Sequence, residues 1–158
     1  MTKLPWNLIR EHAEAEKIDP YLVAAIVQTE SGGNPWTVRF EPKWRYFLHV
    51  REYADSNLIT VKTEEIMQAT SWGLMQVMGT VARELGLKDI ITRLTDPDVN
   101  LSYGCKKLRM LSWNAETESD VIAAYNAGSV RKTPGGMYEN QRYVDKVSEL
   151  LRELREIK

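Results

Sequence analysis

The sequence predicts a mainly α-helical fold with about six to eight helices and at most a small β-hairpin or loop insertion. Two capping signals, Asp19-Pro20 and Asp96-Pro97, place an N-cap aspartate before a proline at the first helical position. Apolar residues recur at helical spacing after these signals. With 158 residues and no internal repeat or linker, we expect residues 1–158 to form one domain with its own core.

The first two elements are helices. Residues 5–17 contain good helix formers, and the candidates for their inner face are Leu8, Ile9, Ala13 and His12. The second helix begins at Pro20, carries an almost unbroken apolar run over residues 21–27 and ends near Glu30. The stretch Gly32-Gly33-Asn34-Pro35 stops it.

Residues 36–70 give weaker signals. Residues 44–51 are spaced for a short helix, whereas residues 58–61 are typical of a brief strand. Thr63 is a candidate cap for a further turn that reaches Met67.

Four helices are expected in the C-terminal half. The first spans residues 79–85 and is closed by Gly86, and the second spans residues 97–113. A shared apolar face in the second consists of Leu101, Gly104, Cys105, Leu108 and Leu111. Ser119 is expected to cap the third, over residues 120–127, and Gly128 to end it. The last begins near Tyr138, with an inner stripe of Tyr143, Val147, Leu150, Leu154 and Ile157.

Composition excludes several classes of function. Hydrophobic residues make up 43% of the chain and charged residues 27%, and the net charge of −1 predicts no nucleic-acid partner. The single cysteine, Cys105, is expected to be a small apolar filler. His12 and His49 lack metal-ligand spacing, so we predict no metal site. No apolar run predicts a secretory signal or an integral membrane segment.

Glu30 is the leading candidate for a catalytic group. The negative end of the helix dipole and burial both disfavour a charged carboxylate, so we expect a raised pKa. A carboxyl group that stays protonated near neutral pH suits a general acid. The alternative, on position alone, is a surface glutamate that merely ends a helix.

Three further segments are unusual for ordinary helix packing: residues 71–79, with Gly-Leu-Met-Gln at 73–76, residues 123–128, which read Ala-Ala-Tyr-Asn-Ala-Gly, and residues 139–144. Taken singly, Met75 and Met78 suit a core, Tyr125 suits packing, and residues 126–128 suit a helix C-cap. Together and in this order, with Glu30-Ser31, they resemble the soluble lytic transglycosylase (SLT) family. The resemblance covers about Asp19 to Val147 and implies a lysozyme-like domain related to goose-type lysozyme.

The resemblance implies roles for individual residues. Glu30 matches the family's catalytic acid and base, and Ser31 matches its helix-ending partner. The other matching positions belong to the sugar groove or its surroundings: Gly73, Gln76, Met78, Ala124, Tyr125, Glu139 and Tyr143. Of these, Gly73 is expected to allow close backbone approach, and the Tyr125 hydroxyl to reach the Glu30 carboxyl. Asn126 is expected to brace a turn.

The implied reaction cleaves the β-1,4 bond between N-acetylmuramic acid and N-acetylglucosamine in peptidoglycan glycan strands. Glu30 donates a proton to the leaving oxygen, and the muramic 2-acetamido group stabilises the anomeric carbon, an exception to the two-carboxylate rule. The Glu30 carboxylate then removes the proton of the C6 hydroxyl, which closes a 1,6-anhydro ring. The resemblance implies no cofactor, and we expect a monomer.

Some features depart from the family pattern. Residues 36–70 form a longer insertion at the cleft edge with four acids: Glu41, Asp55, Glu64 and Glu65. If one of these acids lies across the cleft from Glu30, the enzyme is expected to be an inverting hydrolase, which would be a muramidase or a chitinase. The alternative is that all four are solvated charges of a loop. Gly79 replaces the family's common proline, which predicts a looser following turn. The candidates for stacking on sugars are Trp36, Trp44, Tyr46 and Trp72.

A third class of function is an inactive wall-binding module, which the intact Glu30-Ser31 pair disfavours. For an active enzyme, we expect synthesis in the cytoplasm and action at the bacterial cell wall or periplasm, as a phage lysin or virion component. The alternative is the mature form of an exported enzyme. The single domain favours a thin Gram-negative wall.

Overall fold

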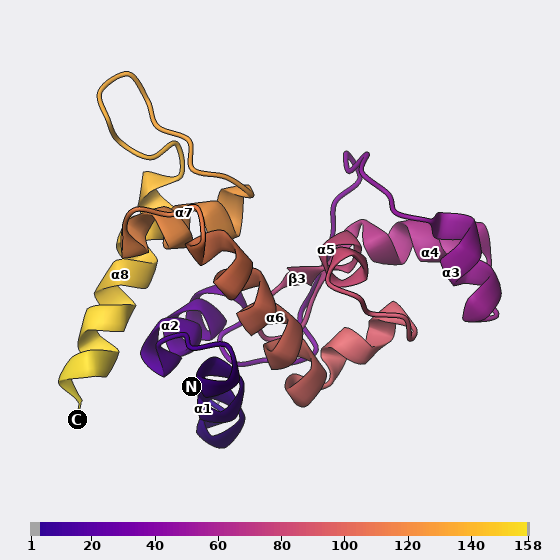
Figure 1. The fold of residues 1–158 in the computed structure, drawn as a ribbon, viewed down its shortest axis with the longest axis horizontal. Coiled ribbons are helices and arrows are strands. Elements are labelled where there is room, and N and C mark those ends of the chain that lie inside the picture. The colour runs from indigo at the N-terminus through magenta and orange to yellow at the C-terminus, as the bar shows by residue number, and fades with distance from the viewer. Residues whose placement is uncertain (1–3, 158) are drawn as a thin grey trace.

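Eight α-helices, one short 3-10 helix and three β-strands are formed within residues 4–157, the part of the chain that the computed structural model describes (Figure 1). The α-helices are α1 Trp6–Ala15, α2 Pro20–Glu30, α3 Val50–Ser56, α4 Val61–Gln68, α5 Gly79–Glu84, α6 Pro97–Ser112, α7 Glu118–Ala127 and α8 Gln141–Glu156. The strands β1 Val38–Phe40, β2 Thr70–Trp72 and β3 Val77–Met78 form an antiparallel sheet in that order, and the 3-10 helix η1 spans Ile91–Thr95. The predicted mainly helical single domain is confirmed.

The helices form two groups with the sheet between them (Figure 1). In one group, α2 packs against α1 and α8, α6 packs against α1 and α7, and α7 packs against α8. In the other, α4 packs against α3 and α5. None of the helices within residues 4–157 is long and apolar enough to cross a membrane.

Helix α2 is the central element of the first group, and residues 22–27 are all buried. The predicted N-cap is confirmed, since Asp19 Oδ1 accepts a hydrogen bond of 2.9 Å from the Tyr21 N–H and Pro20 is the first helical residue. The helix ends at Glu30, and Gly32 and Gly33 follow with φ of 62° and 83°, values that favour glycine. The sequence therefore located the end of this helix correctly.

Helices α6 and α7 differ little from expectation. The apolar face of α6 is confirmed, and Cys105 is buried in it, where burial raises the pKa of its thiol to about 12. The predicted Ser119 cap of α7 is wrong. Thr117 caps the helix instead, because its Oγ1 accepts from the Asp120 N–H while Asp120 Oδ2 accepts from the Thr117 N–H, both at 3.1 Å.

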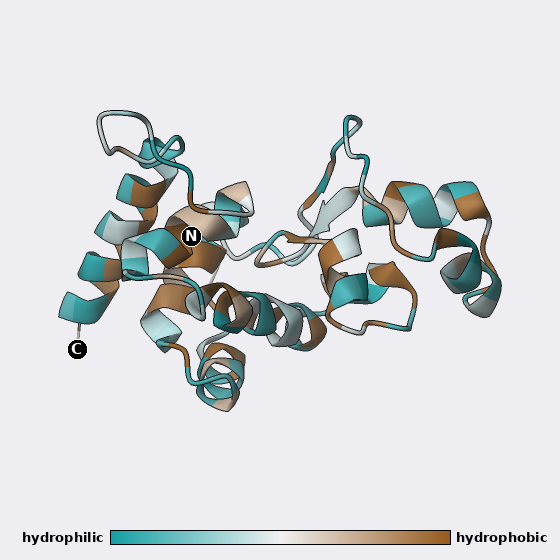
Figure 2. Ribbon diagram, turned by 45° about the horizontal axis from the view of Figure 1, so that its top comes forward, coloured by the Kyte–Doolittle hydropathy of each residue, from teal (hydrophilic) through white to brown (hydrophobic). Residues whose placement is uncertain are grey.

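Helix α8 begins at Gln141, three residues later than expected, because residues 132–138 form a loop closed by the Lys132–Tyr138 bridge. The predicted inner stripe is partly right. Val147 is buried, and Tyr143, Leu150 and Leu154 pack partly buried against the core. The buried Val144 and Leu151 were not predicted, and Ile157 is 80% exposed past the helix end. Figure 2 shows hydrophilic residues along the outer side of α8.

The insertion at residues 36–70 differs most from its prediction. Residues 44–48 are irregular, and the helix expected there begins only at Val50. The strand expected at residues 58–61 is wrong, because Leu58 has a φ of 56° and Thr60 caps α4. Thr63 is not the cap; its N–H donates to Thr60 Oγ1 at 3.1 Å.

A buried ion pair fixes α4 to α5. Arg83 Nε donates to Glu64 Oε1 at 2.8 Å and a terminal Arg83 nitrogen donates to Glu64 Oε2 at 2.9 Å, with both side chains fully buried. Gln68 Nε2 donates to Glu64 Oε1 and to the Leu48 carbonyl, both at 2.8 Å. This network holds the irregular part of the insertion, so the prediction of a solvated loop charge is wrong for Glu64.

The β2–β3 loop is held by Asn100 of α6. Its Oδ1 accepts from the Met75 N–H at 2.8 Å, and its Nδ2 donates to the Trp72 and Leu94 carbonyls at 2.7 and 2.8 Å. Gly73 has a φ of 70°, and a β-carbon there would collide with the Leu94 carbonyl and the Asn100 amide. Only glycine therefore fits this turn.

Gly79, where the family commonly has proline, is required by packing. It is the first residue of α5, and a β-carbon on it would collide with the backbone of Met67 and Gln68 at the end of α4. The glycine thus allows α4 and α5 to approach closely.

Candidate active site

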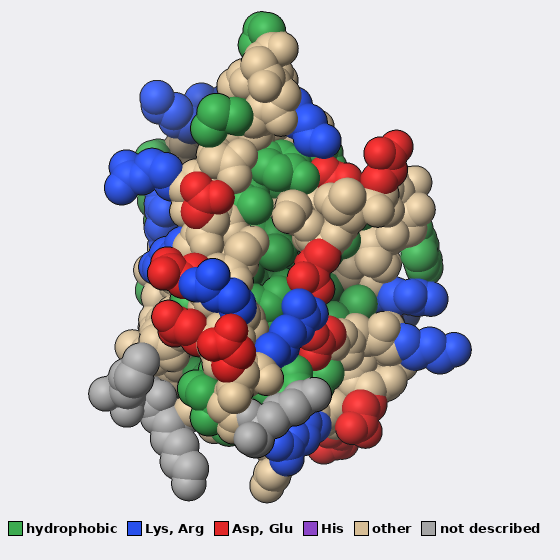
Figure 3. Space-filling model, turned by 90° about the vertical axis from the view of Figure 1, so that its left-hand side faces the viewer, with side chains coloured by type: hydrophobic (Ala, Val, Ile, Leu, Met, Phe, Trp, Pro, Cys, Tyr) green, Lys and Arg blue, Asp and Glu red, His purple; other side chains and the backbone are tan. Residues whose placement is uncertain are grey.

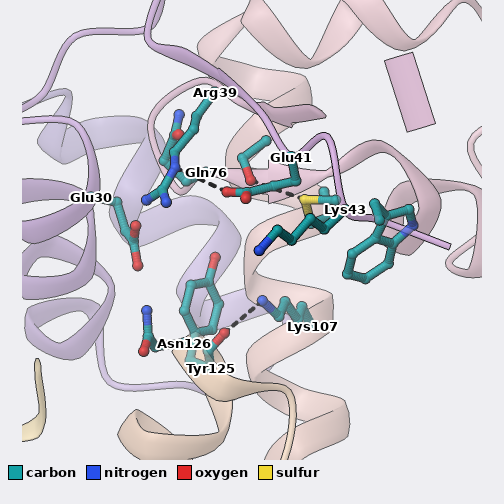
Figure 4. Close-up of a pocket in the computed structure, with 11 residues that line it drawn as sticks. Glu30, Arg39, Glu41, Lys43, Gln76, Lys107, Tyr125 and Asn126 are labelled. Atoms are coloured by element: carbon teal, nitrogen blue, oxygen red, sulfur yellow. Dashed lines mark hydrogen bonds and ion pairs between the residues drawn. The ribbon is translucent and has the colours of Figure 1, made fainter. Parts of the chain in front are cut away.

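A main cleft of about 380 Å3 lies where α2, β1, the β2–β3 segment, α6 and α7 meet (Figure 4). Its lining consists of Glu30, Arg39, Glu41, Lys43, Trp44, Ser71, Gln76, Met78, Lys107, Tyr125 and Asn126. A second hollow of about 520 Å3, here called the α8 pocket, shares Glu30, Arg39 and Asn126 with the main cleft. Its other lining residues are Thr29, Arg142, Tyr143 and Lys146. Glu30 therefore lies at the junction of two hollows.

The Glu30 carboxyl group is half-buried on the last turn of α2. Burial is the largest influence on it and raises its pKa. A hydrogen bond of 2.6 Å from the Tyr143 hydroxyl to Glu30 Oε1 opposes this rise, as do the charges of Lys107, Lys146 and Arg39. The net direction is upward, as expected for a group that acts as an acid near neutral pH.

The tyrosine that bonds the Glu30 carboxyl is Tyr143 rather than Tyr125. The Tyr125 hydroxyl donates to the Met75 carbonyl at 2.7 Å, so the expectation that it reaches the catalytic carboxyl is wrong. Tyr143 of α8 makes that contact instead. Tyr125 is 3% exposed and lines the main cleft, so its remaining role there is to shape the wall.

Two groove residues predicted from the sequence, Gln76 and Met78, line the main cleft together with Glu30 and Tyr125. Gln76 has a φ of 49°, and its Nε2 donates to the carbonyls of Thr37 and Gly73, both at 2.9 Å. Its amide oxygen accepts no hydrogen bond within residues 4–157, so an acceptor remains for a ligand in the cleft.

Other predicted residues do not line the main cleft. Ser31 Oγ lies 2.8 Å from the Leu74 carbonyl and ties the end of α2 to the β2–β3 loop, and Gly73 is buried against α6. Ala124 is buried in α7. Glu139 is exposed in the loop before α8, where its N–H donates to the Arg131 carbonyl at 2.9 Å. Roles of these residues in substrate binding stay predictions.

Sequence reasoning missed the cations of the cleft. Lys107 of α6 lies with its Nζ 3.9 Å from the centre of the Tyr125 ring and donates to the Tyr125 carbonyl at 2.8 Å. Burial lowers the pKa of Lys107 to about 8, against the opposing effect of Glu30. The sequence feature that could have identified Lys107 is its position beside the apolar face of α6, three residues after Gly104. The sequence analysis also missed Arg39 and Lys43, two cleft residues that belong to the insertion.

Comparison with known proteins identifies the domain. Residues 7–143 match the family model described as "Transglycosylase SLT domain". The chain belongs to the SLT transglycosylase family. Enzymes of this family cleave glycosidic bonds in peptidoglycan. A protein of Enterobacteria phage PRD1 described as "Transglycosylase" is 29% identical over 127 residues, which are 78% of this chain. The chain spans 35% of the length of that phage protein.

In this SLT domain, one acid of the insertion lies in the main cleft. Glu41 lines it, with its Oε1 2.9 Å from Arg39 Nε, and Figure 4 shows the Arg39 side chain between Glu30 and Glu41. Asp55 and Glu65 lie elsewhere, Asp55 exposed on α3 and Glu65 at 3.3 Å from Lys62 on α4. With Glu64 buried in its ion pair, Glu41 alone among the four can act on a ligand beside Glu30.

One of the four candidate stacking aromatics lines the main cleft of the SLT domain. Trp44 does so, and its Nε1 is held by the Tyr46 carbonyl at 2.6 Å and Thr80 Oγ1 at 3.1 Å. Trp72 is half-buried, with its Nε1 bonded to the Met67 carbonyl at 3.0 Å. Trp36 and Tyr46 are 73% and 75% exposed, outside the main cleft.

Proposed function

We propose that this protein is a peptidoglycan lytic transglycosylase that cleaves the bond between N-acetylmuramic acid and N-acetylglucosamine and forms a 1,6-anhydromuramic end. The observation that carries the proposal is the half-buried Glu30 carboxyl at the junction of the two hollows, with a raised pKa and a hydrogen bond from Tyr143. Membership of the SLT family supports the class of substrate.

Glu30 acts first as an acid and then as a base. Its protonated carboxyl donates to the glycosidic oxygen while the bond to the muramic anomeric carbon breaks and the 2-acetamido oxygen bonds that carbon. The resulting carboxylate, still bonded to the Tyr143 hydroxyl, removes the proton from the C6 hydroxyl. The C6 oxygen then displaces the acetamido oxygen at the anomeric carbon, so no water is consumed. A single group suits both steps when its pKa lies near the ambient pH.

Mass analysis of digested murein tests the reaction. Products with anhydro ends, lighter than the hydrolytic products by one water, are the expected result. Reducing ends that incorporate labelled oxygen from oxygen-labelled water would contradict the proposal and assign the protein as a hydrolase.

The position of Glu41 favours a second candidate, an inverting hydrolase. Inverting enzymes place a second carboxylate across the bond to activate a water. Glu41 shares the main cleft with Glu30, but its ion pair with Arg39 occupies one of its oxygens. If hydrolysis is the reaction, Glu41→Gln should abolish it, whereas a transglycosylase should keep most of its turnover.

Tyr143→Phe is expected to lower kcat about tenfold, the factor for a lost hydrogen bond to an ionisable group. The Tyr143 bond lowers the Glu30 pKa, so its loss raises that pKa further and moves the alkaline limb of the kcat/KM profile to higher pH. The pH profile of murein cleavage is the measurement. Tyr125→Phe is the control: it leaves the Met75 carbonyl unpaired and is expected to lower stability without moving that limb.

Lys107→Met removes a cation that lowers the Glu30 pKa. The alkaline limb of kcat/KM is therefore expected to move to higher pH, by less than one unit for a partly screened charge. Lys106→Met, which removes the neighbouring cation at the Tyr103 ring, is the matched control and should leave the limb in place. An unmoved limb in Lys107→Met would contradict an electrostatic link between Lys107 and Glu30.

We further propose that the enzyme acts on the bacterial cell wall as a phage lysin or virion component. The relative from phage PRD1 supports this setting. Clearing of purified Gram-negative sacculi is the expected activity.

A further inference from the structure

Arg142 and Lys146 of α8 are two exposed cations that belong to no ion pair in the described part of the chain. Both are exposed, and within residues 4–157 neither forms an ion pair or a hydrogen bond. At this end of the molecule, basic side chains are interspersed with acidic ones (Figure 3), and Arg155 on the same helix is paired with Asp19 and Glu118. The side chains of Arg142 and Lys146 therefore remain available to a ligand.

Both side chains line the α8 pocket beside Glu30 and Tyr143. They stand four residues apart, which places them on the same face of the helix. Tyr143, three residues before Lys146 and also in the pocket lining, donates to the Glu30 carboxyl. The cations thus lie on the element that positions the proposed catalytic group.

The α8 pocket has an excess of positive charge. Its third cation, Arg39, is compensated by Glu41, whereas Arg142 and Lys146 are not. Its single acid is Glu30, which is neutral when it acts as the acid. A hollow lined by charge of one sign attracts ligands of the other sign.

The proposed substrate has anionic groups at this place. The muramic residue whose anomeric carbon reacts at Glu30 also carries the stem peptide, through the lactyl group on its ring. The peptide therefore leaves the glycan strand within one sugar of Glu30, and it carries free carboxylates. With the glycan in the main cleft, the adjoining α8 pocket is the nearest hollow for the peptide.

We infer that Arg142 and Lys146 form a subsite for the carboxylates of the stem peptide, which makes the enzyme selective for peptide-bearing murein. This inference rests on the proposed function.

The test compares two substrates that share one glycan: intact murein strands, and the same strands stripped of peptides by an amidase. The readout is the ratio of kcat/KM on intact strands to kcat/KM on stripped strands. Arg142→Gln/Lys146→Gln is expected to lower this ratio about tenfold, the factor that two exposed ion pairs supply together. Added salt should lower the ratio of the wild type toward that of the variant.

The ratio separates binding from an indirect effect, because a change in the Glu30 pKa alters both rates equally. Arg152→Gln/Lys88→Gln removes two exposed cations that line neither hollow and should keep the wild-type ratio. An equal loss on stripped strands, which expose the lactyl carboxylate, would leave the ratio unchanged and overturn a peptide subsite, as would no loss on either substrate. A wild type that cleaves neither substrate would overturn the proposed function and this inference with it.

Discussion

Glu30→Gln is expected to lower turnover at least about a hundredfold, the lower range for acid–base catalysis. Glutamine has nearly the same shape, and its amide oxygen accepts the Tyr143 hydroxyl as the carboxyl does. It has no proton to give to a glycosidic oxygen at neutral pH, so only the chemistry is lost. Clearing of a cell-wall suspension measures turnover, and circular dichroism checks the fold.

Glu41→Gln is the matched control, since it changes the other carboxylate of the main cleft by the same atoms. A transglycosylase needs one carboxyl, so this variant should lose far less activity than Glu30→Gln. Undiminished clearing by Glu30→Gln would remove Glu30 from the mechanism.

The same substitution should also change how stability depends on pH. The folded-state pKa of Glu30 is raised above the ordinary value of 4.5, so between these two values the folded protein holds a proton that the unfolded chain has released. The stability that the protonated Glu30 contributes is fully present below about pH 4.5, and it is lost as the pH rises through the folded-state pKa. Relative to the wild type, Glu30→Gln should therefore gain free energy of unfolding between about pH 4 and pH 8. Urea unfolding at both pH values measures it.

Local sequence signals correctly predicted the end of α2 and the start of α6, two helices that carry the site. The end of α2 at Glu30 follows from residues adjacent in sequence: an apolar run, then two glycines that take positive φ. The start of α6 likewise follows from Asp96-Pro97, with Asp96 Oδ1 accepting from the Asp98 N–H at 3.0 Å. Such features depend on the nearest few residues, so a single sequence contains them.

Long-range contacts were not predictable in the same way. The Tyr143 hydroxyl meets Glu30 across 113 positions, and which of two tyrosines does so depends on how α7 and α8 pack. The prediction for the insertion was wrong for a related reason. Its irregular segment is held by hydrogen bonds between Leu48 and Gln68, twenty positions apart, and the helical spacing of its own residues does not decide its structure. Lys107 was missed because a lysine on a helix flank is most often solvated.

Glu64→Gln is expected to destabilise the protein by about 3–5 kcal/mol, the cost of leaving a buried charge without its partner. The Arg83 guanidinium keeps its charge and its bonds to the Leu87 and Asp89 carbonyls at 2.7 and 2.8 Å, but it loses the carboxylate that receives two of its donors. The glutamine amide offers one acceptor where the carboxylate offered two. Denaturant unfolding is the measurement, and Tm should fall by roughly 10 °C.

Glu65→Gln is the control for this prediction, because it alters the adjacent residue, whose partner Lys62 is exposed, and should cost less than about 1 kcal/mol. Equal costs for the two variants would show that the buried pair does not hold the insertion.

The consequence for activity follows from Gln68, which bonds both Glu64 and Leu48. When Glu64 no longer anchors Gln68, the segment that carries Glu41, Lys43 and Trp44 is held less firmly to α4, mainly by the bond of 2.8 Å from the Glu41 N–H to the Ala69 carbonyl. Below its Tm, Glu64→Gln should therefore raise KM more than it lowers kcat, since the wall of the main cleft is loosened while Glu30 and Tyr143 stay in place.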